Sequence, residues 1–169
     1  MTVISQEGTA ALRPPRHRVD PRAKLGWTLG AVIGWVIVLA GLLLWAGLSE
    51  DLDGVAGLVC LLALLIAIAH ILVMPQWRYR VHRWEVTETA VYTCDGWLHQ
   101  TWRVAPISRI QTVDTERGPV QQLLGLSTVT VTTASSAGAM KIAGLNHRTA
   151  TTLVDELTAI TQATPGDAT

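Results

Sequence analysis

Two long apolar runs lie close together near the start of the chain. The first, 25–48, contains no charged residue, and the second, 54–74, has only Cys60 and His70 as ionisable side chains. A helix needs roughly 20 apolar residues to cross the hydrocarbon core of a bilayer, and the first run is too long for the apolar core of a cleaved signal peptide. The pattern therefore predicts two transmembrane helices, 25–48 and 54–74, joined by a short external loop at 49–53.

Beyond residue 77 the pattern changes to short segments that are rich in β-branched residues and separated by turn signals, which is typical of an all-β module. Asp95-Gly96 predicts a two-residue hairpin turn, and 118–125 is expected to form a loop. The segment 127–133 alternates Val with Thr, as a half-buried strand does. In total we expect strands at 79–87, 91–94, 97–104, 107–115, 127–133 and 139–143.

The last element is expected to be an amphipathic helix that closes one end of the sheet. Asn146 is a favourable N-cap residue. The apolar residues that follow it share one helical face, and they are Leu153, Val154, Leu157 and Ile160. We expect a short disordered tail at 164–169.

The net charge of zero hides a segregation of charge along the chain. Basic residues lie before the first apolar run and just after the second, whereas the connector between the runs carries only acids. The positive-inside rule then places both termini in the cytoplasm and the connector outside the cell membrane. The polar segment 1–24 lacks apolar periodicity, so we expect a disordered basic arm. The basic residues of this arm have two possible roles. We favour the first, in which they only set the membrane topology; in the second they also lie against anionic lipid.

Small residues mark one face of each apolar run. Gly26, Gly30 and Gly34 recur every four residues in the first run, and Ala63 and Ala67 share a face of the second. Such faces let helix backbones approach closely. We expect the two faces to meet within the hairpin. The alternative left open is a contact between protein molecules, either in a homo-oligomer or with another membrane protein.

His70 continues the alanine face of the second run. An ionisable residue within a span is a candidate functional residue. It lies about one turn from the predicted cytoplasmic end, where interfacial water is within reach, so we favour a structural role. Two spans with one such residue and no relay partner are poorly suited to transport, which leaves a small subunit of a transport complex as a remote alternative.

The chain carries no motif that organises catalytic chemistry. It has no G-x-S-x-G, P-loop or H-E-x-x-H motif and no pair of carboxylates at a helical spacing, so we expect no enzyme activity and no cofactor. His82, Cys94 and His99 lie on neighbouring predicted strands, but their spacing matches no usual set of metal ligands. The near-neutral charge disfavours nucleic acid as a partner.

Three consecutive stretches carry a resemblance to a known family. They are P-I-S-R-I-Q-T-V-D at 106–114, G-P-V-Q-Q-L-L-G-L at 118–126 and S-T-V-T-V-T-T-A at 127–134. In this order and spacing they resemble the YdbS-like family of bacterial PH domains, in which two transmembrane helices typically precede one such domain. The resemblance implies an α+β membrane protein whose residues 77–163 form a PH-like, seven-stranded β-roll capped by a C-terminal helix. Relatives often carry a base where this chain has Gln122.

The resemblance implies no reaction, because PH-like folds are binding platforms whose ligand the fold alone does not define. One possible ligand is the head group of an anionic lipid. The candidate residues for it are basic, namely Arg78, Arg80, Arg83, Arg103, Arg109 and Lys141. However, the segment 78–163 has only eight bases against seven acids, and topology alone accounts for the first three arginines.

A protein partner is the ligand that we prefer. A near-neutral PH-like domain suits a protein surface or a peptide strand added at a sheet edge. The small domain contains an unusually large number of tryptophans, namely Trp84, Trp97 and Trp102. Any of these that is exposed is a candidate anchor for a partner. The resemblance implies membership of a small membrane assembly, in some cases beside a larger relative with several PH-like domains.

Overall fold

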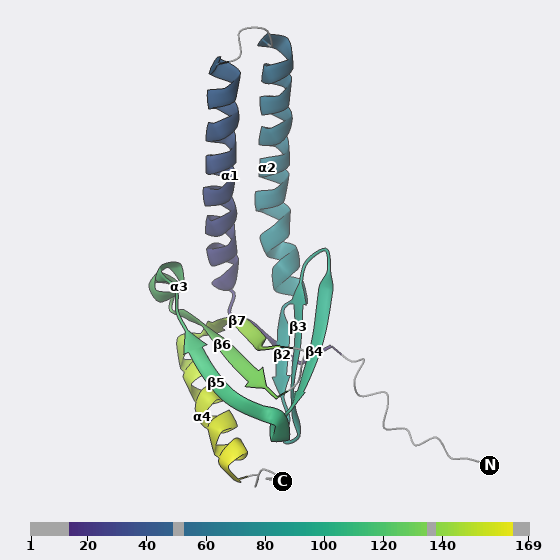
Figure 1. Cartoon of the computed structure of the whole chain (residues 1–169), viewed down its shortest axis with the longest axis vertical. Coiled ribbons are helices and arrows are strands. Elements are labelled where there is room, and N and C mark those ends of the chain that lie inside the picture. Colours follow the sequence, from purple (N-terminus) through teal and green to yellow (C-terminus); the bar gives the residue numbers. More distant parts are fainter. Residues whose placement is uncertain (1–13, 49–52, 135–137, 164–169) are drawn as a thin grey trace, which may run out of the picture.

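Two long helices extend from a small β-domain in the computed structural model (Figure 1). The structure describes residues 14–48, 53–134 and 138–163. Helices α1 (Ala23–Leu48) and α2 (Asp53–Val81) pack side by side, and each is long and apolar enough to cross a membrane. They contain the two predicted spans. Residues 1–13, most of the loop 49–53 and the tail 164–169, for which we predicted disorder or a loop, lie outside the described residues.

Helix α2 continues beyond its apolar run and ends at Val81, so the prediction of a strand from residue 79 is wrong at its start. The last turns of α2 pack against the first turns of α1. Arg78 lies over the Trp27 ring at 4.7 Å, and Lys24 lies over the Tyr79 ring at 4.9 Å. These contacts stabilise the last turns of α2. Pro75 within the helix lacks the backbone N–H that would otherwise donate a helical hydrogen bond.

The β-domain consists of two antiparallel sheets and helix α4 (His147–Ala163). The first sheet has the order β1-β2-β3-β4, with bounds His17–Arg18, Arg83–Val86, Ala90–Gly96 and Gln100–Pro106. The second has the order β5-β6-β7, with bounds Ile110–Glu116, Leu126–Thr133 and Met140–Asn146. The described residues thus contain seven strands, as the predicted roll requires, but one of them precedes the two long helices.

Strand β1 belongs to the arm that we expected to be disordered, so that expectation is wrong from residue 14 onwards. His17 pairs with Trp84 of β2, and Val19 is buried next to it. The Arg16 guanidinium lies 3.3 Å from the carboxylate of Glu85. The predicted boundary of the domain at residue 77 therefore leaves out its first strand, and the helical hairpin is an insertion between β1 and β2.

Three connections differ from the sequence-based prediction. Asp95 and Gly96 belong to β3, and Gly96 pairs with Gln100, so the hairpin turn comprises three residues, 97–99. Gly96 has a φ of 110°, and a Cβ there would collide with the backbone of His99. The expected loop 118–125 contains a short helix, α3 (Pro119–Leu124), in which the Gln121 side chain accepts a hydrogen bond from the Gly118 N–H. The residue before β5, Arg109, ends a 3-10 turn, η2 (Ile107–Arg109), rather than lying in a strand.

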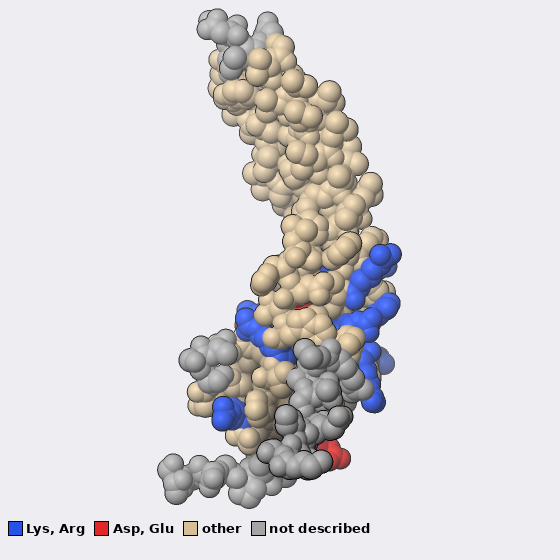
Figure 2. Space-filling view, turned by 90° about the vertical axis from the view of Figure 1, so that its right-hand side faces the viewer, with Lys and Arg blue, Asp and Glu red and all other residues tan. Residues whose placement is uncertain are grey.

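Helix α4 packs on the second sheet and completes the core, as its periodicity predicts. Leu153 and Leu157 are buried, and Val154 and Ile160 pack at the edge of the same cluster. The Asn146 side chain accepts a hydrogen bond from the Arg148 N–H at 3.0 Å, which confirms it as the cap. On the face shown in Figure 2, Lys and Arg side chains gather where the apolar helices meet the β-domain.

Candidate binding groove

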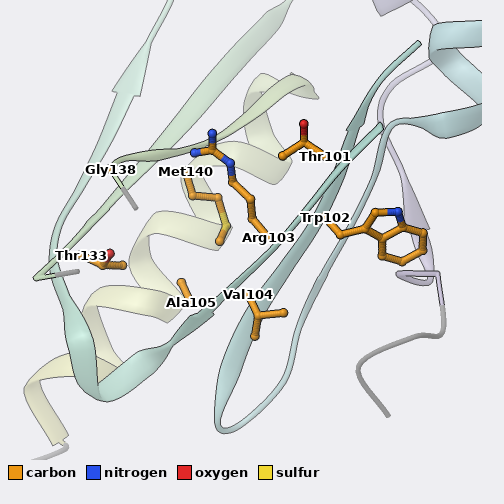
Figure 3. Close-up of a pocket in the computed structure, with 8 residues that line it drawn as sticks. All are labelled: Thr101, Trp102, Arg103, Val104, Ala105, Thr133, Gly138 and Met140. Carbon is orange, nitrogen blue, oxygen red and sulfur yellow. The ribbon is translucent and has the colours of Figure 1, made fainter. Parts of the chain in front are cut away.

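The strand order leaves β4 at the edge of the first sheet and β7 at the edge of the second. A cavity of about 410 Å³ lies between these two edge strands (Figure 3). Its lining residues come from β4, from the end of β6 and from the start of β7, and they are Thr101, Trp102, Arg103, Val104, Ala105, Thr133, Gly138 and Met140. We refer to this cavity, with the outer face of β4, as the edge groove.

The side chains of β4 alternate across the edge groove. Ala105 and Met140 are buried and form an apolar floor. Arg103 extends from β4 towards β7 (Figure 3), where its guanidinium donates a hydrogen bond to the carbonyl oxygen of Ala139 over 2.8 Å. Trp102 and Val104 point to the opposite side of the strand and are 46% and 50% exposed. The groove therefore offers apolar surface on both sides of one cationic group.

An edge strand presents backbone N–H and C=O groups that can pair with another chain. Extended peptides bind such edges through main-chain hydrogen bonds, and pockets for alternate side chains give specificity. Arg103 carries five N–H donors in a planar fork, so it can also bind a partner carboxylate beside its bond to Ala139. The geometry suits an extended peptide rather than a small polar molecule.

The structure brings some of the candidate lipid-binding residues together but does not form one site from all six. Arg103 lines the edge groove, whereas Arg83 and Lys141 line a separate cavity of about 10 Å³. Arg109 ends η2, and Lys141 on β7 lies 3.8 Å from Glu116 in an exposed ion pair. Arg78 and Arg80 lie in the last turn of α2, and Arg83 begins β2.

The three candidate tryptophan anchors have different surroundings. Trp84 packs against both hydrophobic clusters, and its buried Nε1 has no hydrogen-bond partner among the described residues, so it is a core side chain. Trp97, in the hairpin turn, contacts the His70 ring at 5.5 Å. Trp102 is exposed beside the edge groove. Of the three, Trp102 has the position that an anchor for a soluble partner requires.

His82 and Cys94 do come together, around a cavity of only about 10 Å³, while His99 is exposed in the hairpin turn. Burial, and then the positive charge of Arg78, lower the pKa of His82 to about 4. Burial, and then the charge of Asp95, raise the pKa of the Cys94 thiol, which keeps it protonated at neutral pH. Within the described part of the chain, His, Cys, Asp and Glu form no group of three that could hold a metal ion.

Comparison with known proteins identifies the family of this fold. A family model for the Bacterial PH domain matches residues 24–160, which is most of the chain. The chain belongs to the bacterial PH domain family. It is 28% identical over 159 residues to UPF0699 transmembrane protein YdbS of Bacillus subtilis (strain 168), in an alignment that covers 90% of this chain and 97% of that protein. No solved structure matches the chain.

These findings confirm the α+β membrane protein with a PH-like domain and the resemblance to YdbS-like proteins. The matched residues begin at position 24, so they leave out strand β1. The fold of this bacterial PH domain therefore includes a segment that lies outside the family match.

The rotation of α1 differs from our expectation. Ala67 is buried on α2 and Ala63 is partly buried, so the alanine face does pack within the hairpin. Gly30 and Gly34 are exposed, however, and a Cβ built at either position meets no atom within 4 Å. Gly26 faces Leu124 of α3 at 3.5 Å instead. The glycine face therefore does not meet the alanine face, because bulkier α1 side chains such as Trp35 fill the seam.

Most residues of the edge groove were not among the candidate binding residues predicted from the sequence. Val104, Thr133, Gly138 and Met140 carry no chemical motif, and only the alternation along 100–106 could have paired Val104 with Trp102. That β4 lies at an edge depends on the strand order of the whole sheet.

Proposed function

We propose that this protein is a non-catalytic binding module, anchored in the cell membrane, whose PH-like domain binds a protein partner at the edge groove. The observation that carries the proposal is the outer edge of β4, which pairs with no other strand among the described residues and lies beside a cavity of about 410 Å³, with Trp102 and Val104 exposed along it. Large exposed apolar side chains next to unpaired strand edges are typical of sites for added strands.

The distribution of charge supports a cytoplasmic location for the domain and for both termini. Arg22 and Lys24 lie at the start of α1, and Arg78 and Arg80 lie at the end of α2, so the domain end of the helical hairpin is basic. Acidic residues occupy the connector at the other end. Basic flanks stay on the cytoplasmic side of a membrane.

Affinity purification of the tagged full-length protein from its native membranes in mild detergent tests the proposal. The variant Trp102→Ala/Val104→Ser removes the apolar side chains along β4. Gln111→Ala/Thr115→Ala is the matched control, because it changes exposed side chains on β5, the edge strand of the second sheet that lies opposite β7. We expect a co-purifying protein that is lost with the first variant and kept with the control. Partners that both variants retain equally would contradict binding at the groove.

Anionic lipid head groups are the second candidate ligand. Arg80 is exposed at the end of α2, and the fold holds it at the end of the helix that spans the membrane. The domain is then always close to lipid, which gives even a weak site a high local concentration of head groups. Because β1 precedes α1, a fragment that begins at residue 78 would lack a strand, so this test also needs the full chain. Lipid retained after purification should fall in Arg80→Glu and Arg103→Glu if head groups are bound, and should not change if they are not.

A contact within the bilayer is supported by the open glycine face of α1. Gly30 and Gly34 expose backbone to the surroundings of the hairpin, and small-residue faces of this kind pack helices closely in lipid. The occupant would be a second copy of the chain or a related membrane protein with several PH-like domains.

A further inference from the structure

Two leucines of the β-domain are far more exposed than its other apolar side chains. Leu98, in the turn between β3 and β4, is 82% exposed, and Leu123, in α3, is 87% exposed. Among the described residues beyond α2, the other exposed large apolar side chains are Trp102 and Val104, at the edge groove. Single exposed apolar side chains are common on protein surfaces, so the position of these two leucines relative to the long apolar helices decides what they contact.

Both leucines lie beside the membrane helices. Figure 1 shows the β3–β4 turn next to the lower end of α2, and α3 next to the lower end of α1. The first contact is made by Trp97, whose ring lies 5.5 Å from that of His70. The second is made by Leu124, which faces Gly26 at 3.5 Å. Leu98 and Leu123 are the direct chain neighbours of these two contact residues.

The depth of these contacts follows from the geometry of the helices. His70 precedes Met74, the last residue of the second apolar run, by four positions, which places it about 6 Å inside the end of that run. Gly26 is the second residue of the first apolar run. The turn and α3 therefore reach the level at which both helices enter the apolar part of the bilayer.

We infer that the β3–β4 turn and α3 insert Leu98 and Leu123 into the near leaflet of the bilayer, the one in which α1 begins and α2 ends. Interfacial side chains of bound helices are buried by about 5 to 10 Å, which matches the depth of the contact between Trp97 and His70. The contact between Leu124 and Gly26 lies one residue, about 1.5 Å, inside its apolar run. Lipid is what covers the two leucines, because the membrane-spanning helices beside the turn and α3 place lipid at this level. The domain would then be held at three places, by the hairpin and on either side of it.

The polar groups around both leucines fit this position. His99 and Gln100 follow Leu98, and Gln121 and Gln122 precede Leu123. The amides of Gln121 and Gln122 bond within the domain, to Thr128 and to the carbonyl oxygen of Arg117. At the level of the head groups the exposed side chains of His99 and Gln100 and the backbone of the turn can still bond to water and phosphate, which the hydrocarbon core would not allow. The inference concerns the placement of the domain and does not depend on which ligand the edge groove binds.

Fluorescence quenching tests the insertion on the purified full-length protein. Leu98→Cys and Leu123→Cys are made with Cys60 and Cys94 replaced by Ala and are labelled with an environment-sensitive fluorophore. The protein is reconstituted alone in vesicles of phosphatidylethanolamine and phosphatidylglycerol that contain a lipid with a nitroxide near its head group. Val104→Cys is the matched control, because it lies on β4, the strand that follows the turn, at a distance of roughly 20 Å from Leu98 along an extended chain.

We expect the nitroxide lipid to quench the labels at both leucine positions and to leave the label at position 104 bright, while iodide in the buffer shows the reverse order. Equal quenching by iodide at all three positions would overturn the inference and would indicate that a protein partner covers the leucines in the cell. Lipid quenching at only one leucine would overturn insertion on both sides. Because Cys94 is buried, the same labels placed in a chain that keeps Cys94 and carries only Cys60→Ala repeat the measurement with one alanine fewer.

Discussion

Trp35 on α1 donates a hydrogen bond from Nε1 to Nδ1 of His70 on α2 over 3.1 Å. A ring nitrogen that accepts a hydrogen bond carries no proton, so this bond selects the neutral tautomer protonated at Nε2. The ring of Trp97 lies against the same imidazole. His70 therefore joins α1, α2 and the β3–β4 turn, which supports the structural role that its position near the end of the span suggests.

Replacing Trp35 with Phe should weaken the pairing of the two membrane helices. The ring would still fill the seam, but the hydrogen bond to His70 would be lost, and such bonds contribute about 0.6 to 1 kcal/mol within membranes. Titration of the full-length protein with SDS in mixed micelles, followed by circular dichroism, measures the loss. Trp77→Phe is the control, since Trp77 is half exposed on α2. Equal stability of the two variants would show that the bond contributes nothing measurable.

The two small-residue faces should respond differently to a larger side chain. Ala67 is 2% exposed, so Ala67→Leu should force α1 and α2 apart and destabilise the hairpin by about 1 to 3 kcal/mol. At Gly30 no atom lies within 4 Å of the site of a Cβ, so Gly30→Leu should leave the stability of the single molecule unchanged. If the glycine face joins two copies, Gly30→Leu should reduce the mass of the complex in mild detergent, as measured by light scattering. An unfolded Gly30→Leu variant would contradict the observed rotation of α1.

Alanine substitutions at two glycines with nearly the same backbone conformation test how the domain is joined to α1. Gly138 and Gly144 have φ values of 77° and 79°, so alanine at either position pays the cost of a left-handed residue, about 1 kcal/mol. A Cβ at Gly144 would also lie 2.8 Å from the Cβ of Ala23 at the start of α1, whereas at Gly138 no atom of the described residues lies within 4 Å. Thermal unfolding should therefore show a larger loss of stability for Gly144→Ala than for Gly138→Ala. The difference measures the contact between the domain and the first membrane helix.

The sequence allowed prediction of the elements whose signal is local. The uninterrupted apolar runs define both spans, and the spacing of Leu153 and Leu157 defines α4 with its buried face. Strand β1 has no such signal, because two residues show no periodicity and the partner of His17 is Trp84, beyond the whole helical hairpin. The edge groove was equally inaccessible, since the exposure of Trp102 depends on β4 having a neighbour on one side only.

The rotation of a helix about its own axis is another property that a residue pattern leaves open. Gly30 and Gly34 form as clear a small-residue face as Ala63 and Ala67, yet only the alanine face lies in the seam. Trp35 competes for that seam with its ring and its hydrogen bond to His70. In a small two-helix unit, one such side chain is enough to turn the glycines outward.

The buried His82 should make the stability of the domain depend on pH. Its ring lies 4.9 Å from that of Trp27, and its Nδ1 lies 3.1 Å from the carbonyl oxygen of Arg78. Its pKa is about 4 in the folded protein, against an ordinary value of 6.5. Between these values the unfolded chain binds a proton that the folded protein does not. The stability contributed by neutral His82 is therefore complete above pH 6.5 and is lost as the pH falls towards 4, by about 3 kcal/mol in all.

The nearby charges act on this titration in opposite directions, since Arg78 lowers the pKa of His82 and Asp95 raises it. Carboxylates elsewhere also titrate in this range, so the measured quantity is the difference between the wild type and His82→Gln. Unfolding temperatures of the two proteins in detergent should differ most at pH 7 and should converge as the pH approaches 4. A constant difference over this range would mean that His82 takes up its proton with an ordinary pKa in the folded state, and that its burial beside Trp27 at the end of α2 does not exclude the charged form.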